Sequence, residues 1–302
     1  MSTSPQPDAQ TVEPPKPLLP VEGLNVLHLY YTINHALWRS LNGEERQAAR
    51  THFTELVQTI RNHPRTQLLI FSVITPKADI GFMLLTPDLH DANRFEKQLT
   101  LALGAEALLP VYNYYSMTEL SEYSTSEEEY KKQLLAEMKA QEQQQQHGTE
   151  IVLNPNDVEG SEDFEMRLGE WRQRMKKYNQ DRLYPNMAMD WQVLCFYPMS
   201  KRRVGTDNWY SLDFDARREL MSGHARVGRQ WHGKIRQLIT GSTGLDTMEW
   251  GVTLLAHDVY HVKGIVYQMR FDEVSARFAE FGDFYIGIQL PVDELLHRSL
   301  LD

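Results

Sequence analysis

The 302-residue chain is long enough for one large domain or for two domains of about 100 to 150 residues each. Its apolar runs are far shorter than the about 18 residues of a membrane helix, so we expect no membrane span. The N-terminus lacks the cationic start and apolar stretch of an export leader, and the single cysteine, Cys195, cannot form an internal disulfide. We therefore expect a cytoplasmic protein, and the net charge of −10 argues against a nucleic-acid partner.

Residues 1–20 contain six of the fourteen prolines and no periodic apolar pattern. Such a segment cannot bury enough apolar surface to offset the entropy that it loses on ordering. The sequence therefore predicts a disordered, Pro-rich tail ahead of the first folded domain.

Residues 21–120 alternate between strand-like and helix-like apolar patterns, which predicts a first folded domain. The order β-α-β-β-α-β is that of a ferredoxin-like unit. The expected strands are 25–33, 66–74, 80–87 and 109–117, and the expected helices are 42–60 and 89–103.

Residues 121–181 form a linker of different composition. Between Ser126 and Met166 there are eleven acidic residues and three lysines, so this stretch alone carries a net charge of −8. It predicts a polar helix that runs into a glutamine-rich stretch, then an acidic loop and a further helix. We expect a solvated surface insertion without catalytic content.

Residues 182–302 repeat the order β-α-β-β-α-β without obvious sequence identity to the first domain. The sequence thus predicts an α+β protein in which two tandem ferredoxin-like units form a barrel-like subunit, with the helices outside. The space between a sheet and its long helix is a natural ligand site. The expected strands are 189–199, 237–243, 248–256 and 284–290, and the expected helices are one of about 25 residues after Ser211 and 258–269.

His224 lies in the middle of an apolar stripe of the long helix expected after Ser211. A histidine on such a face is most often a hydrogen-bonded core residue. The alternative is an axial ligand of haem iron, because a porphyrin supplies the other four ligands and Gly223 leaves room for a flat molecule. The stripe consists of Leu220, His224, Val227, Trp231, Ile235 and Leu238.

Tyr197 is expected to end a strand, and Lys201 follows four residues later across a turn at Pro198. A free tyrosine has a pKa of about 10 and is a poor acid or base at neutral pH. A nearby ammonium would favour the phenolate, or would anchor a carboxylate beside the ring. The third interpretation is an ordinary strand-end tyrosine with surface cations, and Arg202 and Arg203 have no assigned role.

Five segments together closely resemble the chlorite dismutase superfamily and, within it, the coproheme decarboxylases of haem synthesis. They cover most of the chain from Arg182 to Leu290, whereas residues 24–120 resemble the family in pattern more than in sequence. The segments are RLYP (182–185), CFYPMSKRR (195–203), NWYSLDFDARRELMSGHARVGR (208–229), ITGSTGLDTMEWGVTLLAHD (239–258) and VYQMRFDEVSARFAEFGDFYIG (266–287).

The resemblance implies that His224 is the proximal ligand of haem iron. It implies that Tyr197 is oxidised to a radical that abstracts a hydrogen from the β-carbon of a propionate, with Lys201 beside that propionate. Further positions of the porphyrin pocket are implied for Arg182, Met199, Arg229 and Ser275.

Gln237 matches the distal position at which chlorite-splitting relatives carry an arginine. Arginine is a permanent cation that can hold chlorite, whereas glutamine is neutral, so the resemblance disfavours chlorite degradation. Arg236 is the next residue, and an alignment shift by one position would reverse this interpretation.

The resemblance implies that iron-coproporphyrin III (coproheme) is both substrate and redox cofactor, with hydrogen peroxide as oxidant. Two successive decarboxylations give protohaem b. We also expect a homopentamer, and a transient contact with ferrochelatase is a further partner to test. The alternatives are a haem-dependent chlorite-degrading enzyme and a haem-binding protein without turnover.

Overall fold

The computed structural model describes residues 15–145, 158–187 and 190–302, and it contains a single nine-stranded sheet. The strands are β1 (Asn25–Ile33), β2 (Gln67–Val73), β3 (Ile80–Thr86), β4 (Leu108–Thr118), β5 (Val193–Lys201), β6 (Ile235–Gly241), β7 (Trp250–Ala256), β8 (Ala279–Phe281) and β9 (Tyr285–Gln289). They are ordered β7-β6-β4-β1-β3-β2-β9-β5-β8, and β5 also pairs with β7. This last pairing closes every strand except β8 into a barrel, which removes the exposed edges of the sheet.

The barrel consists of two copies of one strand arrangement. In the first copy the order is β4-β1-β3-β2, and in the second it is β9-β5-β7-β6, so each follows the order fourth-first-third-second along its own segment. This is the ferredoxin-like arrangement, and the predicted fold of two such units is confirmed. Short pairings of β2 with β9 and of β4 with β6 join the copies.

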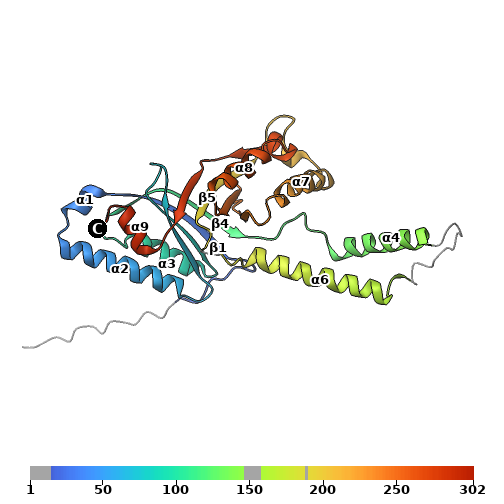
Figure 1. Ribbon diagram of the computed structural model, residues 1–302, viewed down its shortest axis with the longest axis horizontal. Helices are drawn as coiled ribbons and strands as arrows, with labels where there is room; N and C mark the ends of the chain where they lie inside the picture. The colour runs from blue at the N-terminus through green and yellow to red at the C-terminus, as the bar shows by residue number, and fades with distance from the viewer. Residues whose placement is uncertain (1–14, 146–157, 188–189) are drawn as a thin grey trace, which may run out of the picture.

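The helices lie outside the barrel, as expected, and are distributed over two sides of it (Figure 1). They are α1 (His35–Ser40), α2 (Gly43–Arg61), α3 (Leu89–Thr100), α4 (Glu127–Gln145), α6 (Glu162–Leu183), α7 (Phe214–Arg229), α8 (Val259–Met269) and α9 (Val292–Arg298), with single turns η1 (Trp209–Ser211) and η2 (Val274–Phe278). Helices α2, α3 and α9 cover the first unit, and α7 and α8 cover the second. The short helices α1 and α9 have no counterpart in the sequence prediction.

Alternating side chains of β1 show how the strands separate two cores. Leu29 and Tyr31 pack against α2 and α3 on the outer side. Val26 and Tyr30 pack inside the barrel. The period of two in the sequence therefore divides each strand between a helix-covered core and the barrel interior.

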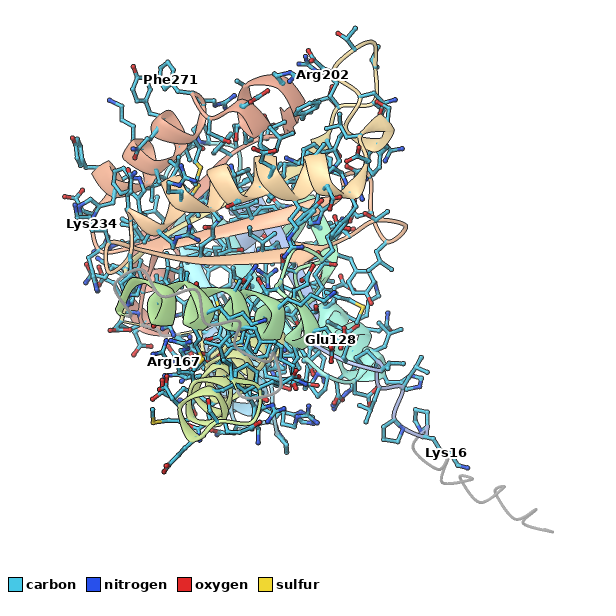
Figure 2. All side chains as sticks on the ribbon, turned by 90° about the vertical axis from the view of Figure 1, so that its right-hand side faces the viewer. Lys16, Glu128, Arg167, Arg202, Lys234 and Phe271 are labelled. Atoms are coloured by element: carbon cyan, nitrogen blue, oxygen red, sulfur yellow. The ribbon has the colours of Figure 1, made fainter. Side chains whose placement is uncertain are left out.

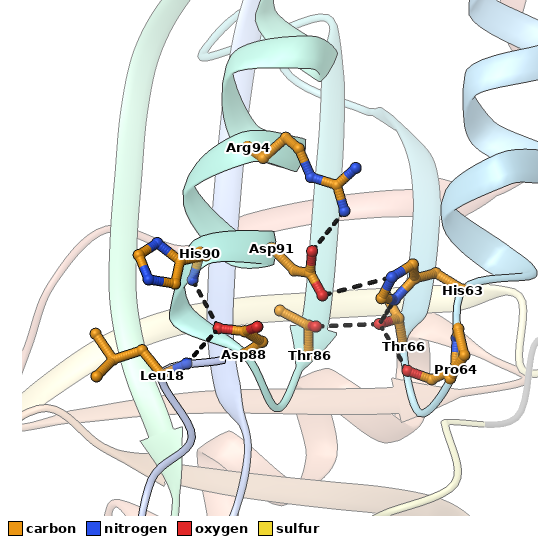
Figure 3. Close-up of polar contacts among 9 residues, drawn as sticks. All are labelled: Leu18, His63, Pro64, Thr66, Thr86, Asp88, His90, Asp91 and Arg94. Carbon is orange, nitrogen blue, oxygen red and sulfur yellow. Dashed lines mark hydrogen bonds and ion pairs between the residues drawn. The ribbon is translucent and has the colours of Figure 1, made fainter. Parts of the chain in front are cut away.

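A polar cluster fixes the point where α3 begins (Figure 3). Asp88 caps α3 by accepting from the backbone N–H of His90, and it also accepts from the N–H of Leu18, both at 3.0 Å. His63, after α2, lies 3.5 Å from the Asp91 carboxylate. The segment ahead of β1 is thereby attached at Leu18, whereas residues 1–14 of the predicted tail lie outside the described residues.

Helix α7 is shorter than the sequence pattern suggests. It ends at Arg229, and the chain then turns at Gly233, whose φ is 77°, a value that favours glycine. Ile235 and Leu238, expected to continue the helical stripe, belong to β6. The prediction of a helix of about 25 residues was therefore wrong, because the apolar spacing continued by coincidence into a turn and a strand.

Helices α4 and α6 form an arm that extends away from the strands (Figure 1). The arm has a small core of its own, in which Leu134 and Phe164 are buried and the rings of Tyr130 and Trp171 stack at 4.8 Å. Arg172 of α6 also pairs with Glu127 of α4. The two predicted helices of the linker are present, whereas the end of the glutamine-rich stretch and residues 154–157 of the predicted acidic loop lie outside the described residues.

Candidate functional site

A cavity of about 410 Å³ lies between the outer face of β5, β6 and β7 and the helices α7 and α8. This is the expected position, between a sheet and its long helix. None of the side chains of α7 is fully buried, although the helix is amphipathic, because its apolar face borders the cavity rather than a filled core. Of the eight residues predicted for the site, seven line this cavity: Arg182, Tyr197, Met199, Lys201, His224, Gln237 and Ser275.

Arg229 is the predicted residue that does not line this cavity. It lies exposed in the last turn of α7, about one and a half turns beyond His224. Among the described residues that border the cavity, the cationic side chains are Arg182 and Lys201.

Tyr197 points from β5 into the cavity wall and is 8% exposed. Its ring stacks on Phe284 with 4.4 Å between the ring centroids. Burial raises the pKa of Tyr197 well above its usual value, with a further increase from Cys195 and an opposing effect of Arg270. The surroundings of Tyr197 therefore favour a neutral phenol that keeps its hydrogen, rather than the phenolate.

Lys201 lies on the same strand as Tyr197, not beyond a turn. Strand β5 continues through Pro198 to Lys201, and Gly282 donates its N–H to the Pro198 carbonyl at 2.8 Å. Four residues along a strand separate the two Cα atoms by about 13 Å. The ammonium and the phenol therefore border one cavity at separate points, where one extended ligand can contact both.

Burial also changes the pKa of Lys201, which is 8% exposed. Desolvation lowers the pKa of Lys201 to about 8, while Asp272 and Glu249 act in the opposite direction. Its Nζ lies 4.6 Å from the ring centroid of Trp209, which stabilises the cation. Lys201 is thus a partly desolvated cation that an anionic ligand would stabilise further.

The two arginines after Lys201 have structural partners outside the cavity. Arg203 pairs with the buried carboxylate of Glu249, which also accepts from the Lys201 backbone N–H at 2.8 Å. Arg202 lies 3.8 Å from both Asp207 and Glu280. Both arginines therefore have partners near the end of β5, and of these three neighbouring cations Lys201 is the one that borders the cavity.

His224 is held by a carboxylate that the sequence analysis missed. Its Nδ1 lies 2.9 Å from Oδ2 of Asp272, whose carboxylate also accepts from the backbone N–H groups of Val274 and Ser275. Burial raises the pKa of Asp272, but the bonds from His224 and Ser275 outweigh this effect and lower it below its usual value. With Nδ1 donating to Asp272, Nε2 is the nitrogen left to bind a ligand.

No cluster of three or more potential metal-ligating side chains occurs within residues 15–145, 158–187 and 190–302. A metal bound through His224 would therefore receive most of its ligands from the molecule that carries it. Iron in a porphyrin is such a case, because the macrocycle supplies four ligands and one histidine supplies the fifth.

The alternation of β6 determines which of two neighbouring residues borders the cavity. Gln237 and Ile239 line it. Leu238 packs on the other side of the sheet, inside the barrel, and Arg236 shares that side by the period of two. An alignment shift by one position would have placed Arg236 in the site. In the structure Gln237, and not Arg236, borders the cavity.

The first residues of the linker, 121–123, and residues that flank the linker on both sides line the cavity, whereas the sequence predicted a surface excursion. Residues 119–123 line one wall, and Arg182 reaches it from the end of α6. The Arg218 guanidinium of α7 forms a bidentate pair with Glu129 of α4, at 2.5 and 3.1 Å. In Figure 2, α4, which carries the labelled Glu128, runs nearly parallel to α7, with strand ribbons visible between the two helices. The linker therefore holds one cavity wall against the helix that carries His224.

Replacing Asp272 by alanine is expected to lower the free energy of unfolding by about 2–4 kcal/mol. The substitution leaves the N–H groups of Val274, Ser275 and the His224 ring without their acceptor in a partly buried place. Urea unfolding measures the loss. Asp272→Asn keeps one acceptor oxygen and should lose less, and equal stability of wild type and Asp272→Ala would contradict the role of this carboxylate.

The protein is a closed barrel of two ferredoxin-like units, and its cavity lies between one face of the sheet and a helix that carries a histidine. Comparisons with known proteins point to a family with this fold. The chlorite dismutase family model matches residues 46–290, and the chain belongs to this family. A heme-binding protein from Thermus thermophilus is 33% identical, with 93% of this chain and 96% of that chain covered and a TM-score of 0.71.

Chlorite dismutase itself has the same fold at lower sequence identity. A variant of the enzyme from Candidatus Nitrospira defluvii in which one arginine is replaced by alanine is 16% identical, with 93% of this chain and 96% of that chain covered and a TM-score of 0.64. The imidazole complex of that enzyme gives the same identity, coverage and TM-score. No helix within the described residues is both long and apolar enough to cross a membrane.

Proposed function

We propose that this chain binds iron-coproporphyrin III in the cavity and uses hydrogen peroxide to convert two of its propionates to vinyl groups, giving protohaem b. The observation that carries the proposal is the placement of His224 on the helix wall and of Tyr197 and Gln237 on the strand wall of one cavity. Membership of the family and the 33% identity to a heme-binding protein support a haem-type ligand.

The residues present fit an iron porphyrin. The cavity volume lies within the range of about 300–1,000 Å³ of small-molecule sites. Apolar side chains of β7 and α8, among them Val252 and Ile265, offer a surface for a flat macrocycle. His224 would bind the iron through Nε2, and Arg182 and Lys201 would pair with propionates.

Each decarboxylation balances with one molecule of peroxide. The carboxylate leaves as carbon dioxide, and the side chain gives up two electrons in all and one proton, which comes from its β-carbon. Peroxide takes up these two electrons and two protons, one of them from solvent, and becomes two molecules of water. The bound iron porphyrin supplies the route by which peroxide oxidises the site.

The protein positions the reacting side chain and exchanges a hydrogen atom with it. Tyr197, a neutral phenol, would lose its hydrogen and then take the hydrogen of the propionate β-carbon. Lys201 would hold the carboxylate of the same propionate from its separate point on β5. Met199 lies between them on the strand and lines the same wall.

The first alternative is chlorite degradation, which the family as a whole supports. The neutral Gln237 borders the cavity where a permanent cation would be expected for holding chlorite. Haem-loaded protein mixed with chlorite is therefore expected to release little oxygen. Rapid oxygen release would replace the proposed function with this alternative.

Peroxide titration of coproheme-loaded protein tests the proposal directly. Mass spectrometry is expected to show a porphyrin that loses first one and then two carboxyl groups, with one peroxide consumed for each. A porphyrin of constant mass would leave the second alternative, a haem-binding protein without turnover.

The affinity for iron-coproporphyrin III is expected to fall as the pH rises through about 8. Lys201 is charged below this pKa and neutral above it, so its attraction to a propionate is lost in that window. Absorbance titrations across this range measure the change. Lys201→Met should bind weakly with little pH dependence there, whereas Lys201→Arg should keep its affinity at high pH; a steep decline in both variants would assign the effect to another group.

The proposal includes a homopentamer in the cytoplasm and a transient contact with ferrochelatase. Its support is the resemblance of residues 182–290 to coproheme decarboxylases. Light scattering of the purified protein tests the pentamer, and a monomeric mass would contradict it.

A further inference from the structure

Glu119 is a carboxylate on the wall of a cavity proposed to bind a multiply anionic ligand. It follows the end of β4 and lines the cavity. Its Oε1 accepts the indole N–H of Trp250 at 3.2 Å. A Cβ atom on Gly241 would overlap Oε2 of Glu119, so the glycine of β6 leaves the space that this carboxyl group occupies.

Arg182 borders the same cavity and is bound to the main chain of Glu119. Its Nε donates to the backbone carbonyl of Glu119 at 3.1 Å, and its Nη1 lies 3.4 Å from the hydroxyl of Tyr178. The guanidinium therefore borders the cavity beside Glu119, and it is held there through the main chain of that residue. Three elements, α6, β6 and β7, thus build one acidic and one cationic group into the same part of the wall.

The surroundings of Glu119 change the pKa of its carboxyl group. Burial raises its pKa, the Trp250 bond and Arg182 lower it, and Glu122 of the same segment raises it, with a net increase. Lys201, on β5, is the other cationic side chain on the cavity wall within the described residues. An incoming carboxylate would add a further negative charge and raise the pKa of Glu119 again.

We propose that Glu119 is a ligand-binding acid that takes up one proton from solvent when a carboxylate of the ligand docks between it and Arg182. The protonated Glu119 donates a hydrogen bond to that carboxylate, and the Arg182 guanidinium pairs with it. The identity of the ligand rests on the proposed function, whereas the acidic group and its supports are features of this chain.

Proton uptake links affinity to pH by reciprocity. Because binding raises the pKa of Glu119, the affinity for a polycarboxylate ligand increases as the pH falls through this pKa. This dependence occurs at lower pH than the range around pH 8 in which Lys201 titrates. At the lower pH Lys201 is fully charged and exchanges no proton on binding. The two cavity groups can therefore be measured separately.

Calorimetric titration with metal-free coproporphyrin III tests the proposal at pH about 6, where Lys201 stays charged. The metal-free ligand forms no bond to His224, so that histidine does not contribute a ligation-linked proton. Buffers with different ionisation enthalpies give the number of protons exchanged. Wild type is expected to take up protons on binding, and Glu119→Gln, which keeps an acceptor for Trp250, is expected to lose more than half of this uptake.

Glu122→Gln is the matched control, because it removes the same charge from the same wall. The Glu122→Gln variant should keep most of the proton uptake of the wild type. Gly241→Ala, which displaces the Glu119 carboxyl group, should behave like Glu119→Gln. Equal uptake in wild type and Glu119→Gln, or no uptake in wild type, would overturn the proposal.

The same titration separates this proposal from the proposed function. It measures binding and protons without peroxide or iron, so the absence of decarboxylation in the peroxide experiment leaves its result unaffected. If metal-free coproporphyrin III does not bind to wild type, the Glu119 proposal fails, whereas the proposed function is still decided by the peroxide titration of iron-coproporphyrin III, which can also bind through His224.

Discussion

Replacing Tyr197 by phenylalanine is expected to abolish decarboxylation while the variant still binds iron-coproporphyrin III. Phenylalanine keeps the stacking on Phe284 and the buried position in β5, so the fold and the cavity are retained. The substitution removes only the O–H group that is proposed to give up and recover a hydrogen atom. Mass spectrometry after peroxide addition should show unchanged coproheme, and the free energy of unfolding in urea should change little, by about 1 kcal/mol or less.

Tyr285→Phe is the control for this experiment. Tyr285 is also a buried tyrosine, 6% exposed, but it packs inside the barrel, on the other side of the sheet from the cavity. This variant should convert coproheme at the wild-type rate. Wild-type activity in Tyr197→Phe would remove the hydrogen-transfer role, and loss of porphyrin binding would show that the phenol is a structural group instead.

The strands of the two ferredoxin-like units could be predicted because each has a short apolar run with local turn signals. Their closure into one barrel depends on pairings such as Val73 with Gly287 and Thr118 with Thr240. These pairs lie more than a hundred residues apart and involve only two or three positions at each junction. A periodic pattern contains no information about such contacts.

The site residues that could be predicted are those that a local pattern in the sequence indicates. His224 lies on an amphipathic segment, and Tyr197 and Lys201 lie four residues apart, so local patterns found them. Asp272, which fixes the orientation of the His224 ring, lies 48 residues away and has no spacing that connects it to the histidine. An acidic residue two positions before a helical turn does not by itself indicate a contact with a histidine, because most such residues only cap the turn.

The error at Pro198 has a different cause. Proline usually marks the end of a strand because it cannot donate a backbone hydrogen bond. In β5 this position tolerates it, since the carbonyl of Pro198 still accepts from Gly282 and the strand continues to Lys201. The short β8 pairs with this last part of β5 and holds Lys201 over the cavity.

The cavity contribution of residues at the borders of the linker was missed, because composition describes the middle of this segment and not the positions that flank it. The acidic residues at the starts of α4 and α6 suit a solvated arm, as expected. Glu119 and Arg182, which flank the linker, are separated by 63 positions in the sequence, and the hydrogen bond between them brings them together. Two distant segments of mixed polarity give no common pattern before the chain folds.

Replacing His224 by alanine is expected to remove the bond between the protein and the porphyrin iron. The loss should change the Soret and charge-transfer bands of iron-coproporphyrin III, whereas the affinity for metal-free coproporphyrin III should change little. The reason is that the contacts of Arg182, Lys201 and the apolar wall do not involve the imidazole. Peroxide-dependent decarboxylation should fall to the background rate, because the axial ligand tunes the iron.

Added imidazole provides the decisive control for this variant. The substitution leaves a space of the size of the ring, and Asp272 remains to accept the N–H of an imidazole that enters it. Imidazole should therefore restore part of the wild-type spectrum in His224→Ala but not in the double variant His224→Ala, Asp272→Ala. His232→Ala, at an exposed histidine just beyond α7, should leave the spectrum unchanged. A wild-type spectrum in His224→Ala without imidazole would mean that another residue binds the iron.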